Sequence, residues 1–469
     1  MTKVGLLVLA EGHQREDVYK SRRAAEVRET NVLLDALKDQ VEVVLPEGSD
    51  DVRGKRELIK AVKRFEGMDL DAVLIFVSTF ISASLAAMAV RILNIPCAIL
   101  GNNARDSYSQ VGYLAALGAI EQAGLTVRRV TGDIREEAVR KELMNFFTAA
   151  HVKKQLLGQT YGMFGGRSLG ISTGSADTAQ WLQVFGVDIE QIDQFQIVKE
   201  AENIPAEEVG NCRKWIASKY GKLDFKEGKF DGSSLERMIR SYLAVKKIAE
   251  DSELDFLGIK CQPDMSNGYV LQCLTVQLLN DPYDADGAKD PMVCSCEADC
   301  DGAMTMQILK LLSEGRPTAL QDIFFYDKEN IVFANCGSSA SWFAAKSSDP
   351  DENLKEVYLI PHGFGVAGGA ATQFCFAPGE YTYARLFRKG REYVMAYAKG
   401  EVQQITREDL DNYVWYRPTA VVKGIDTDAF AREFDCNHMH CVAGDYTEQL
   451  KAFCELQGIP MICLSRKEG

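Results

Sequence analysis

The sequence predicts an α/β chain, with two doubly wound parallel-sheet domains followed by an antiparallel, β-barrel-like C-terminal domain. Three observations predict this order. Apolar runs alternate with amphipathic helices up to about residue 155, the alternation returns before residue 320, and a period-two pattern follows. Apolar strands joined by helical crossovers form parallel sheets covered on both faces, whereas period-two strands between tight turns form antiparallel sheets. The predicted domains are residues 1–157, 158–320 and 321–469.

In the first domain the apolar runs predict five strands, and the amphipathic segments 16–38 and 55–65 predict helices between them. A charged helix over 133–154 leads into the second domain. Ligands of such sheets bind at the carboxyl ends of the strands. The predicted strands are 4–9, 41–45, 72–77, 97–100 and 126–130.

The second domain repeats this alternation, and the third changes to short strands separated by Pro378-Gly379 and Lys389-Gly390 turns. Thr447 is the predicted cap of a final helix that runs to about residue 457. The second domain has predicted helices over 235–249, 269–279 and 303–312, and predicted strands over 256–260 and 292–295. The third has predicted strands over 373–376, 381–386 and 393–397.

Composition excludes several classes of protein. A chain of 469 residues with 46% hydrophobic content is long enough for about three domains. The net charge of −14 argues against nucleic-acid binding, which needs a basic surface. The first apolar run is too short to span a membrane and has no cleavage site after it, so we expect a cytoplasmic protein. Thirteen cysteines, scattered through apolar segments, are typical of reduced thiols.

Histidines and carboxylates suggest a metal site. His438 and His440 stand one residue apart, Asp264 follows one predicted strand, and Glu297 and Asp299 follow the next. Carboxylates at the ends of neighbouring strands are placed as an α/β active site requires. One imidazole with two or three carboxylates is a hard, oxygen-rich ligand set, which suits manganese or magnesium rather than structural zinc.

Other residues are candidates for substrate contact. Lys260, Gln262 and Asp264 share one face if the strand continues, and would point into a cleft. The alternative is a surface ion pair between Lys260 and Asp264, which contributes little stability. His13 and His362, each beside a glycine, could also reach a substrate.

The glycine-dense segment 165–174 fits neither a dinucleotide-binding nor a Walker pattern. It is either a tight turn or a loop that binds a sugar through backbone donors.

Several blocks together resemble the L-fucose isomerase and L-arabinose isomerase superfamily. The blocks occur in the family's order from about residue 158 to residue 460, and the first domain matches in architecture only. They are Gly165-Gly166-Arg167 through residues 181–193, the Cys-Gln-Pro-Asp turn at 261–264, residues 297–302, Asn335-Cys336-Gly337, and Asn437-His438 before Gly444-Asp445.

The resemblance implies two Rossmann-like domains and a β-barrel-like domain. It also implies an aldose–ketose isomerase with manganese, or another divalent metal such as magnesium or cobalt, held by two carboxylates and a histidine. By this correspondence the metal ligands are Asp264, Asp299 and His438, and the two aspartates move the proton. Glu297 and His440 would support the ligands. The family usually has glutamate as its first ligand, so Asp264 is one methylene shorter.

The implied reaction converts an open-chain sugar through an enediol by proton transfer between C1 and C2. Lys260, Gln262 and His362 would orient hydroxyls. Alternatively Lys260, Arg167 or His13 would bind an anionic group, making a sulfonated sugar such as sulfoquinovose the substrate. A sugar-binding protein without turnover is the remaining alternative. The resemblance further implies a homo-oligomer, hexameric or built from trimers, with active sites shared between subunits, and neither nucleic acid nor membrane as a partner.

Overall fold

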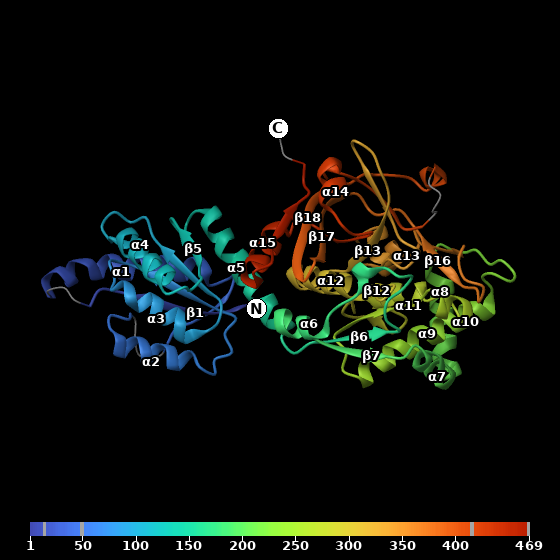
Figure 1. Cartoon of the computed structure of the whole chain (residues 1–469), viewed down its shortest axis with the longest axis horizontal. Coiled ribbons are helices and arrows are strands. Elements are labelled where there is room, and N and C mark those ends of the chain that lie inside the picture. Colours follow the sequence, from blue (N-terminus) through green and yellow to red (C-terminus); the bar gives the residue numbers. More distant parts are fainter. Residues whose placement is uncertain (13–15, 47–50, 413–416, 467–469) are drawn as a thin grey trace. The chain divides into compact units, whose positions relative to one another are not determined.

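The computed structural model describes residues 1–12, 16–46, 51–412 and 417–466 (Figure 1). Contacts divide the chain into two compact units, Met1–Lys154 and Gln155–Gly469. Among the described helices, none is both long enough and apolar enough to cross a membrane.

The N-terminal unit is built on a parallel five-stranded sheet in the order β2-β1-β3-β4-β5. Every residue of β3 is buried, as its unbroken apolar sequence predicts. The strand order reverses between β1 and β3, which is the topological switch point of this sheet. The elements are β1 Lys3–Leu9, α1 Glu16–Leu37, β2 Glu42–Val44, α2 Lys55–Phe65, β3 Ala72–Val77, α3 Ala83–Leu93, β4 Cys97–Gly101, α4 Ser109–Gln122, β5 Arg128–Thr131 and α5 Glu137–Leu156.

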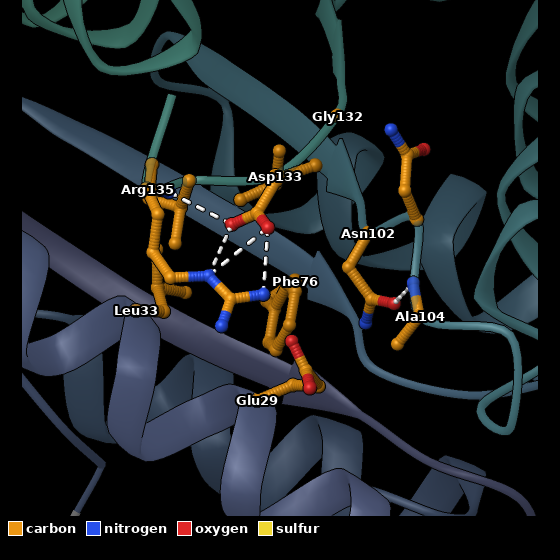
Figure 2. Close-up of a pocket in the computed structure, with 11 residues that line it drawn as sticks. Glu29, Leu33, Phe76, Asn102, Ala104, Gly132, Asp133 and Arg135 are labelled. Atoms are coloured by element: carbon orange, nitrogen blue, oxygen red, sulfur yellow. Dashed lines mark hydrogen bonds and ion pairs between the residues drawn. The ribbon is translucent and has the colours of Figure 1, made fainter. Parts of the chain in front are cut away.

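A cavity of about 80 Å³ lies at the carboxyl ends of β3, β4 and β5 (Figure 2). Asp133 and Arg135 form an ion pair at its wall, with 2.6 Å between oxygen and nitrogen. Asn102 accepts a hydrogen bond from the backbone of Ala104 at 2.9 Å. Asn102 also donates to the Ser78 carbonyl at 3.3 Å, so these contacts connect the loops that follow the strands.

The second unit begins with a parallel four-stranded sheet in the order β12-β9-β6-β7. Its strands are β6 Thr160–Phe164, β7 Asp188–Ile192, β9 Phe256–Ile259 and β12 Cys294–Cys296. Its helices are α6 Thr178–Phe185, α7 Phe195–Asn203, α8 Ala206–Lys219, α9 Gly232–Asp251, α10 Asp264–Gly268, α11 Cys273–Asn280 and α12 Cys300–Leu312. Short strands β10 Tyr283–Asp284 and β11 Gly287–Ala288 form a separate antiparallel pair.

The rest of the chain forms a closed antiparallel barrel of six strands. They follow the order β17-β20-β13-β14-β19-β18, and the pairing of β17 with β18 closes the ring. The predicted barrel-like domain is therefore confirmed. The barrel strands are β13 Thr318–Tyr326, β14 Ile331–Ala334, β17 Gly379–Lys389, β18 Glu392–Val402, β19 Thr419–Lys423 and β20 His438–Ala443.

Smaller elements surround the barrel. β21 (Met461–Cys463) extends it beside β18, and β8 (Lys222–Leu223), β15 (Tyr358–Pro361) and β16 (Ala370–Gln373) form a three-stranded sheet. The remaining helices are α13 Pro350–Leu354, α14 Thr427–Glu433 and α15 Thr447–Gln457.

Two local details differ from the sequence expectations. The strand predicted over 256–260 ends at Ile259 and does not continue, and Asp264 begins α10. Thr447 is the first residue of α15 rather than its cap, and Asp445 accepts hydrogen bonds from its backbone amide and its hydroxyl. In both places a short polar side chain bonds to its local neighbours, which apolar periodicity does not reveal.

In the N-terminal unit, Glu26 of α1 lies buried in a cluster of charges. Arg23 bonds to Glu26 and, at 2.6 Å, to Asp51, and Arg53 contacts Asp51 at 2.6 Å. Burial, together with the hydrogen bond and the charge of Asp51, raises the pKa of Glu26 to about 8. The Glu26 carboxyl is therefore mostly protonated in the folded protein at neutral pH.

This shift predicts a pH-dependent stability. Because the folded pKa exceeds the ordinary value of 4.5, the contribution of Glu26 is full below pH 4.5 and is lost as the pH rises through about 8. Since glutamine cannot ionise, Glu26→Gln should raise the melting temperature more at about pH 8.5 than at about pH 5. Thermal unfolding of both proteins over this range measures the effect, and an equal shift at every pH would contradict it.

Candidate functional site

Two barrel strands place a carboxylate directly beside a histidine. Asp322 of β13 is the Cα partner of His438 at the start of β20, in an antiparallel ladder. Cross-strand partners of this kind have Cβ atoms about 5 Å apart. The Asp322 Oδ1 atom lies 3.3 Å from His438 Nε2.

A second carboxylate reaches the same nitrogen from the parallel sheet. Glu297 follows β12 in a turn where both it and Ala298 have positive φ angles, 61° and 49°. This left-handed geometry is unfavourable for residues with a side chain, and it directs the Glu297 Oε2 atom to 3.3 Å from His438 Nε2. Neither Oε2 of Glu297 nor Nε2 of His438 has a hydrogen-bond partner among the described residues.

Asp299 holds the other side of the imidazole. Its Oδ2 atom is 2.8 Å from His438 Nδ1, and its Oδ1 atom accepts a hydrogen bond from the Gly302 amide at 2.9 Å. Arg385, fully buried on β17, donates to Oδ2 at 2.5 Å and to Oδ1 at 3.0 Å. A carboxylate has about four lone-pair positions, and these contacts occupy all of them.

The glycine-dense segment 165–174 and Gly302 both contact the Asp299–Arg385 ion pair or its members. Arg385 also donates to the backbone carbonyl of Thr173 at 2.7 Å. A Cβ atom built on Gly302 would lie 2.6 Å from both Asp299 Oδ2 and His440 Nε2. Only glycine therefore allows the first turn of α12 to approach the ion pair this closely.

The charges of the site agree with these contacts. Burial alone would raise the pKa of Asp299, but the Arg385 guanidinium and the His438 hydrogen bond hold it far below its usual range. Burial raises the pKa of Glu297, although the nearby His438 opposes this. Burial would lower the pKa of His438, but the surrounding carboxylates Asp299, Asp322 and Glu297 raise it well above its ordinary value. Three carboxylates around one imidazole form a site that favours a bound cation.

Glu297 and Asp322 each bring one oxygen to the same nitrogen of His438, and these three residues are candidate ligands of a divalent metal. Ligand atoms at adjacent positions of an octahedral ion, each at about 2.1 Å from it, are about 3 Å apart. The two carboxylate oxygens each lie 3.3 Å from the Nε2 atom, close to this separation. Asp299 on the Nδ1 side has the position of a carboxylate that orients a metal-binding histidine.

The structure gives the predicted carboxylates different surroundings. Asp299 contacts Arg385, the Gly302 amide and His438 Nδ1. Asp264 forms an ion pair with Lys260 at 2.6 Å, and 55% of its side chain is exposed. Because Asp264 begins α10, its side chain lies beside Lys260. An ion pair between these two residues was the alternative prediction. Glu297, which was predicted to support the ligands, brings its Oε2 atom to 3.3 Å from His438 Nε2.

The other predicted residues are more dispersed. Arg167 is exposed, and Gln262 is half-buried with its backbone carbonyl bonded to Ser168 at 3.0 Å. His362 is buried near Arg417, with 3.4 Å between Nε2 and Nη1. His440 is fully buried beside Arg385, and burial lowers its pKa well below the ordinary value. That environment agrees with a supporting role for His440.

His13 lies outside the described residues.

Asp322 was missed by sequence reasoning. It stands inside a strand with no neighbouring motif, and its proximity to His438 depends on the β13–β20 register over 116 residues of chain. One feature of the sequence could have indicated it, because Asp322 is a charged residue in a strand that otherwise has none. Such a charge in a strand is unusual unless it has a function or a partner.

Comparison with known proteins finds similarity to sugar isomerases. Residues 333–465 match the family model of the L-fucose isomerase C-terminal domain. A sulfoquinovose isomerase from Alkalicoccus urumqiensis is 23% identical over 338 residues, which cover 71% of this chain and 70% of that protein. The corresponding enzyme of Priestia aryabhattai is 24% identical and covers 68% of each chain.

These matches support the resemblance of the chain to the fucose isomerase-like superfamily. Among solved structures, a periplasmic solute-binding protein from Actinobacillus succinogenes with bound D-allose covers 60% of this chain and 82% of its own. Its 11% identity and TM-score of 0.15 are too low to support an inference.

The role of Asp299 is testable with a neighbouring control. Asp299→Asn removes the charge that orients His438 and should lower Mn²⁺ affinity about 10- to 100-fold. Asp301→Asn, on the same turn, should leave the affinity nearly unchanged, because Asp301 bonds instead to Trp181 and Arg388. Calorimetric titration of folded proteins with Mn²⁺ measures both, and equal losses would contradict the assignment.

Proposed function

We propose that the protein is a metal-dependent aldose–ketose isomerase whose centre is formed by Glu297, Asp322 and His438. The observation that carries this proposal is the approach of two carboxylates, from separate sheets, to the same imidazole nitrogen at 3.3 Å. Resemblance to the fucose isomerase-like superfamily and similarity to proteins named sulfoquinovose isomerase support the reaction class. A divalent ion such as Mn²⁺ would supply a Lewis acid that polarises the sugar carbonyl and makes the adjacent C–H more acidic.

The chain's own groups have separate tasks in this proposal. Glu297 and Asp322 move the proton between C1 and C2 of the open-chain sugar through an enediol. Burial raises the pKa of Glu297, which makes its carboxylate a stronger base for proton transfer. Asp322, with 35% of its side chain exposed, is accessible to a substrate. Asp299 and Arg385 keep the imidazole of His438 in place.

The substrate class is the open part of the proposal. Relatives named for sulfoquinovose, a sulfonated sugar, favour an anionic aldose. Lys260 is paired with Asp264, which reduces its attraction for a sulfonate. Arg167 is exposed, and Arg417 is buried beside His362. We therefore favour Arg417 and His362 over Lys260 as groups that orient the sugar.

A homo-oligomer with shared active sites and a cytoplasmic location stay predictions. Light scattering of the purified protein tests the first of these, since a monomer would contradict shared sites.

The assignment of the proton-transfer groups predicts a clear contrast between two variants. Glu297→Gln keeps the shape of the side chain but removes the base, and should lower kcat by about 10²- to 10⁴-fold. Asp264→Asn should change kcat by less than about threefold, because Asp264 pairs with Lys260 in an exposed position. Turnover with saturating Mn²⁺ and sugar measures both. A large loss of kcat in Asp264→Asn, with none in Glu297→Gln, would instead assign the proton transfer to Asp264.

The substrate class is tested by hydrogen exchange in deuterated water. The Mn²⁺-loaded protein should incorporate deuterium at C2 of an aldose, because the enediol exchanges its proton with solvent. A panel containing 6-sulfonated, 6-phosphorylated and uncharged hexoses should show the highest kcat/KM for a sulfonated sugar. Preference for an uncharged aldose would contradict the anionic substrate but not the isomerase. Binding without exchange for every sugar would indicate a non-catalytic sugar-binding protein.

A further inference from the structure

A cluster of thiols lies next to the proposed metal centre. The sulfur atoms of Cys296, at the end of β12, and Cys336, after β14, are 3.4 Å apart. A ligand atom of Cys273 and one of His362 lie with the Cys336 sulfur, all within 4.8 Å of one another. Cys296 immediately precedes Glu297, so the cluster adjoins a proposed metal ligand in the chain.

The hydrogen bonds of this cluster argue against a second metal site. The Phe364 backbone amide donates to His362 Nδ1 at 2.9 Å. A metal ion at His362 would have to use Nε2, which lies 3.4 Å from the Arg417 guanidinium, so a positive charge already opposes a cation there. The Cys273 sulfur lies 3.7 Å from the Cys336 carbonyl oxygen. A structural zinc site needs four donors, whereas three described residues, Cys273, Cys336 and His362, have ligand atoms this close together.

Cys336 is the most exposed member of the cluster. It is half-buried, whereas Cys273 and Cys296 are 3% and 4% exposed. Hydrogen bonds from the thiols of Cys273 and Cys296, together with His362, lower the pKa of Cys336 well below its ordinary value. Partial exposure and stabilisation of the thiolate are the conditions under which cysteine reacts with oxidants.

We propose that Cys336 and Cys296 are a peroxide-sensitive thiol pair that forms a disulfide and thereby disturbs Glu297. The Cys336 thiolate attacks one oxygen of hydrogen peroxide, the O–O bond breaks, and hydroxide leaves while a sulfenic acid forms. The hydroxide takes the proton of the Cys296 thiol and becomes water. The Cys296 thiolate then attacks the Cys336 sulfur, the S–S bond forms, and the S–O bond breaks. The departing hydroxide is protonated by solvent, so two thiols reduce one peroxide to two waters.

The consequence for Glu297 follows from distance. A disulfide requires the sulfurs to move from 3.4 Å to about 2.05 Å apart. Cys296 pulls on the turn at Glu297 and Ala298, whose positive φ angles leave little room for adjustment. The effect on activity rests on the proposed function of Glu297, whereas the formation of the disulfide does not.

Disulfide mapping and activity test the two parts separately. The full-length, Mn²⁺-loaded protein is treated with hydrogen peroxide, its remaining thiols are alkylated, and its peptides are analysed by mass spectrometry. We expect a peptide linked through Cys296 and Cys336, and a loss of isomerase activity of about tenfold that dithiothreitol reverses. A Cys296–Cys336 disulfide in a protein without isomerase activity would contradict the proposed function but not the thiol pair.

Matched variants identify the cysteines responsible. Cys336→Ser should remove both the linked peptide and the peroxide sensitivity. Cys463→Ser should leave both intact, because Cys463 is exposed and has no described thiol partner. The pair is refuted if oxidised Cys336 remains unlinked to Cys296, or if Cys336→Ser loses activity to peroxide as the parent does. Purification with one zinc ion per chain that Cys336→Ser abolishes would also refute it in favour of a metal site.

Discussion

The buried ion pair between Asp299 and Arg385 connects the parallel sheet of the second unit to the barrel. Asp299 follows β12, Arg385 lies on β17, and both side chains are almost completely shielded from solvent. Removing one member of such a pair leaves an uncompensated buried charge, which costs about 3–5 kcal/mol. The proposed site depends on this pair, because the same Asp299 carboxylate fixes His438. Gly302 lets the first turn of α12 approach this ion pair closely, and the Thr173 carbonyl accepts a hydrogen bond from Arg385.

The turn after β12 supplies both kinds of carboxylate that the site needs. The acceptor positions of the buried Asp299 carboxylate are all occupied, whereas the Oε2 atom of Glu297, two residues earlier, has no described hydrogen-bond partner. Non-glycine residues with positive φ cost about 1–3 kcal/mol each and persist only where their surroundings hold them. Here the capping bond from Asp299 to the Gly302 amide and the contact with His438 hold the turn. Strain at this position therefore serves to point Glu297 at the imidazole.

The architecture was predictable because local patterns determine it. The apolar run 72–77 coincides with β3, the segment 55–65 coincides with α2, and the period-two texture after residue 320 correctly indicated the barrel. His438 and the block 297–302, which the sequence singled out, lie together in the structure. The roles inside that block did not follow from the sequence, because Glu297 and Asp299 are separated by one residue and only the turn geometry distinguishes them. Asp322 required the strand register, which no local pattern contains.

The central claim is that Glu297, Asp322 and His438 bind the catalytic metal while Asp299 supports the histidine. Anomalous diffraction from crystals grown with Mn²⁺ tests it most directly. The account predicts one strong manganese peak about 2.0–2.4 Å from oxygens of Glu297 and Asp322 and from His438 Nε2, with Asp299 remaining on Nδ1. A peak bonded to Asp264 or to Asp299, or a peak at the cluster of Cys273, Cys336 and His362, would contradict it.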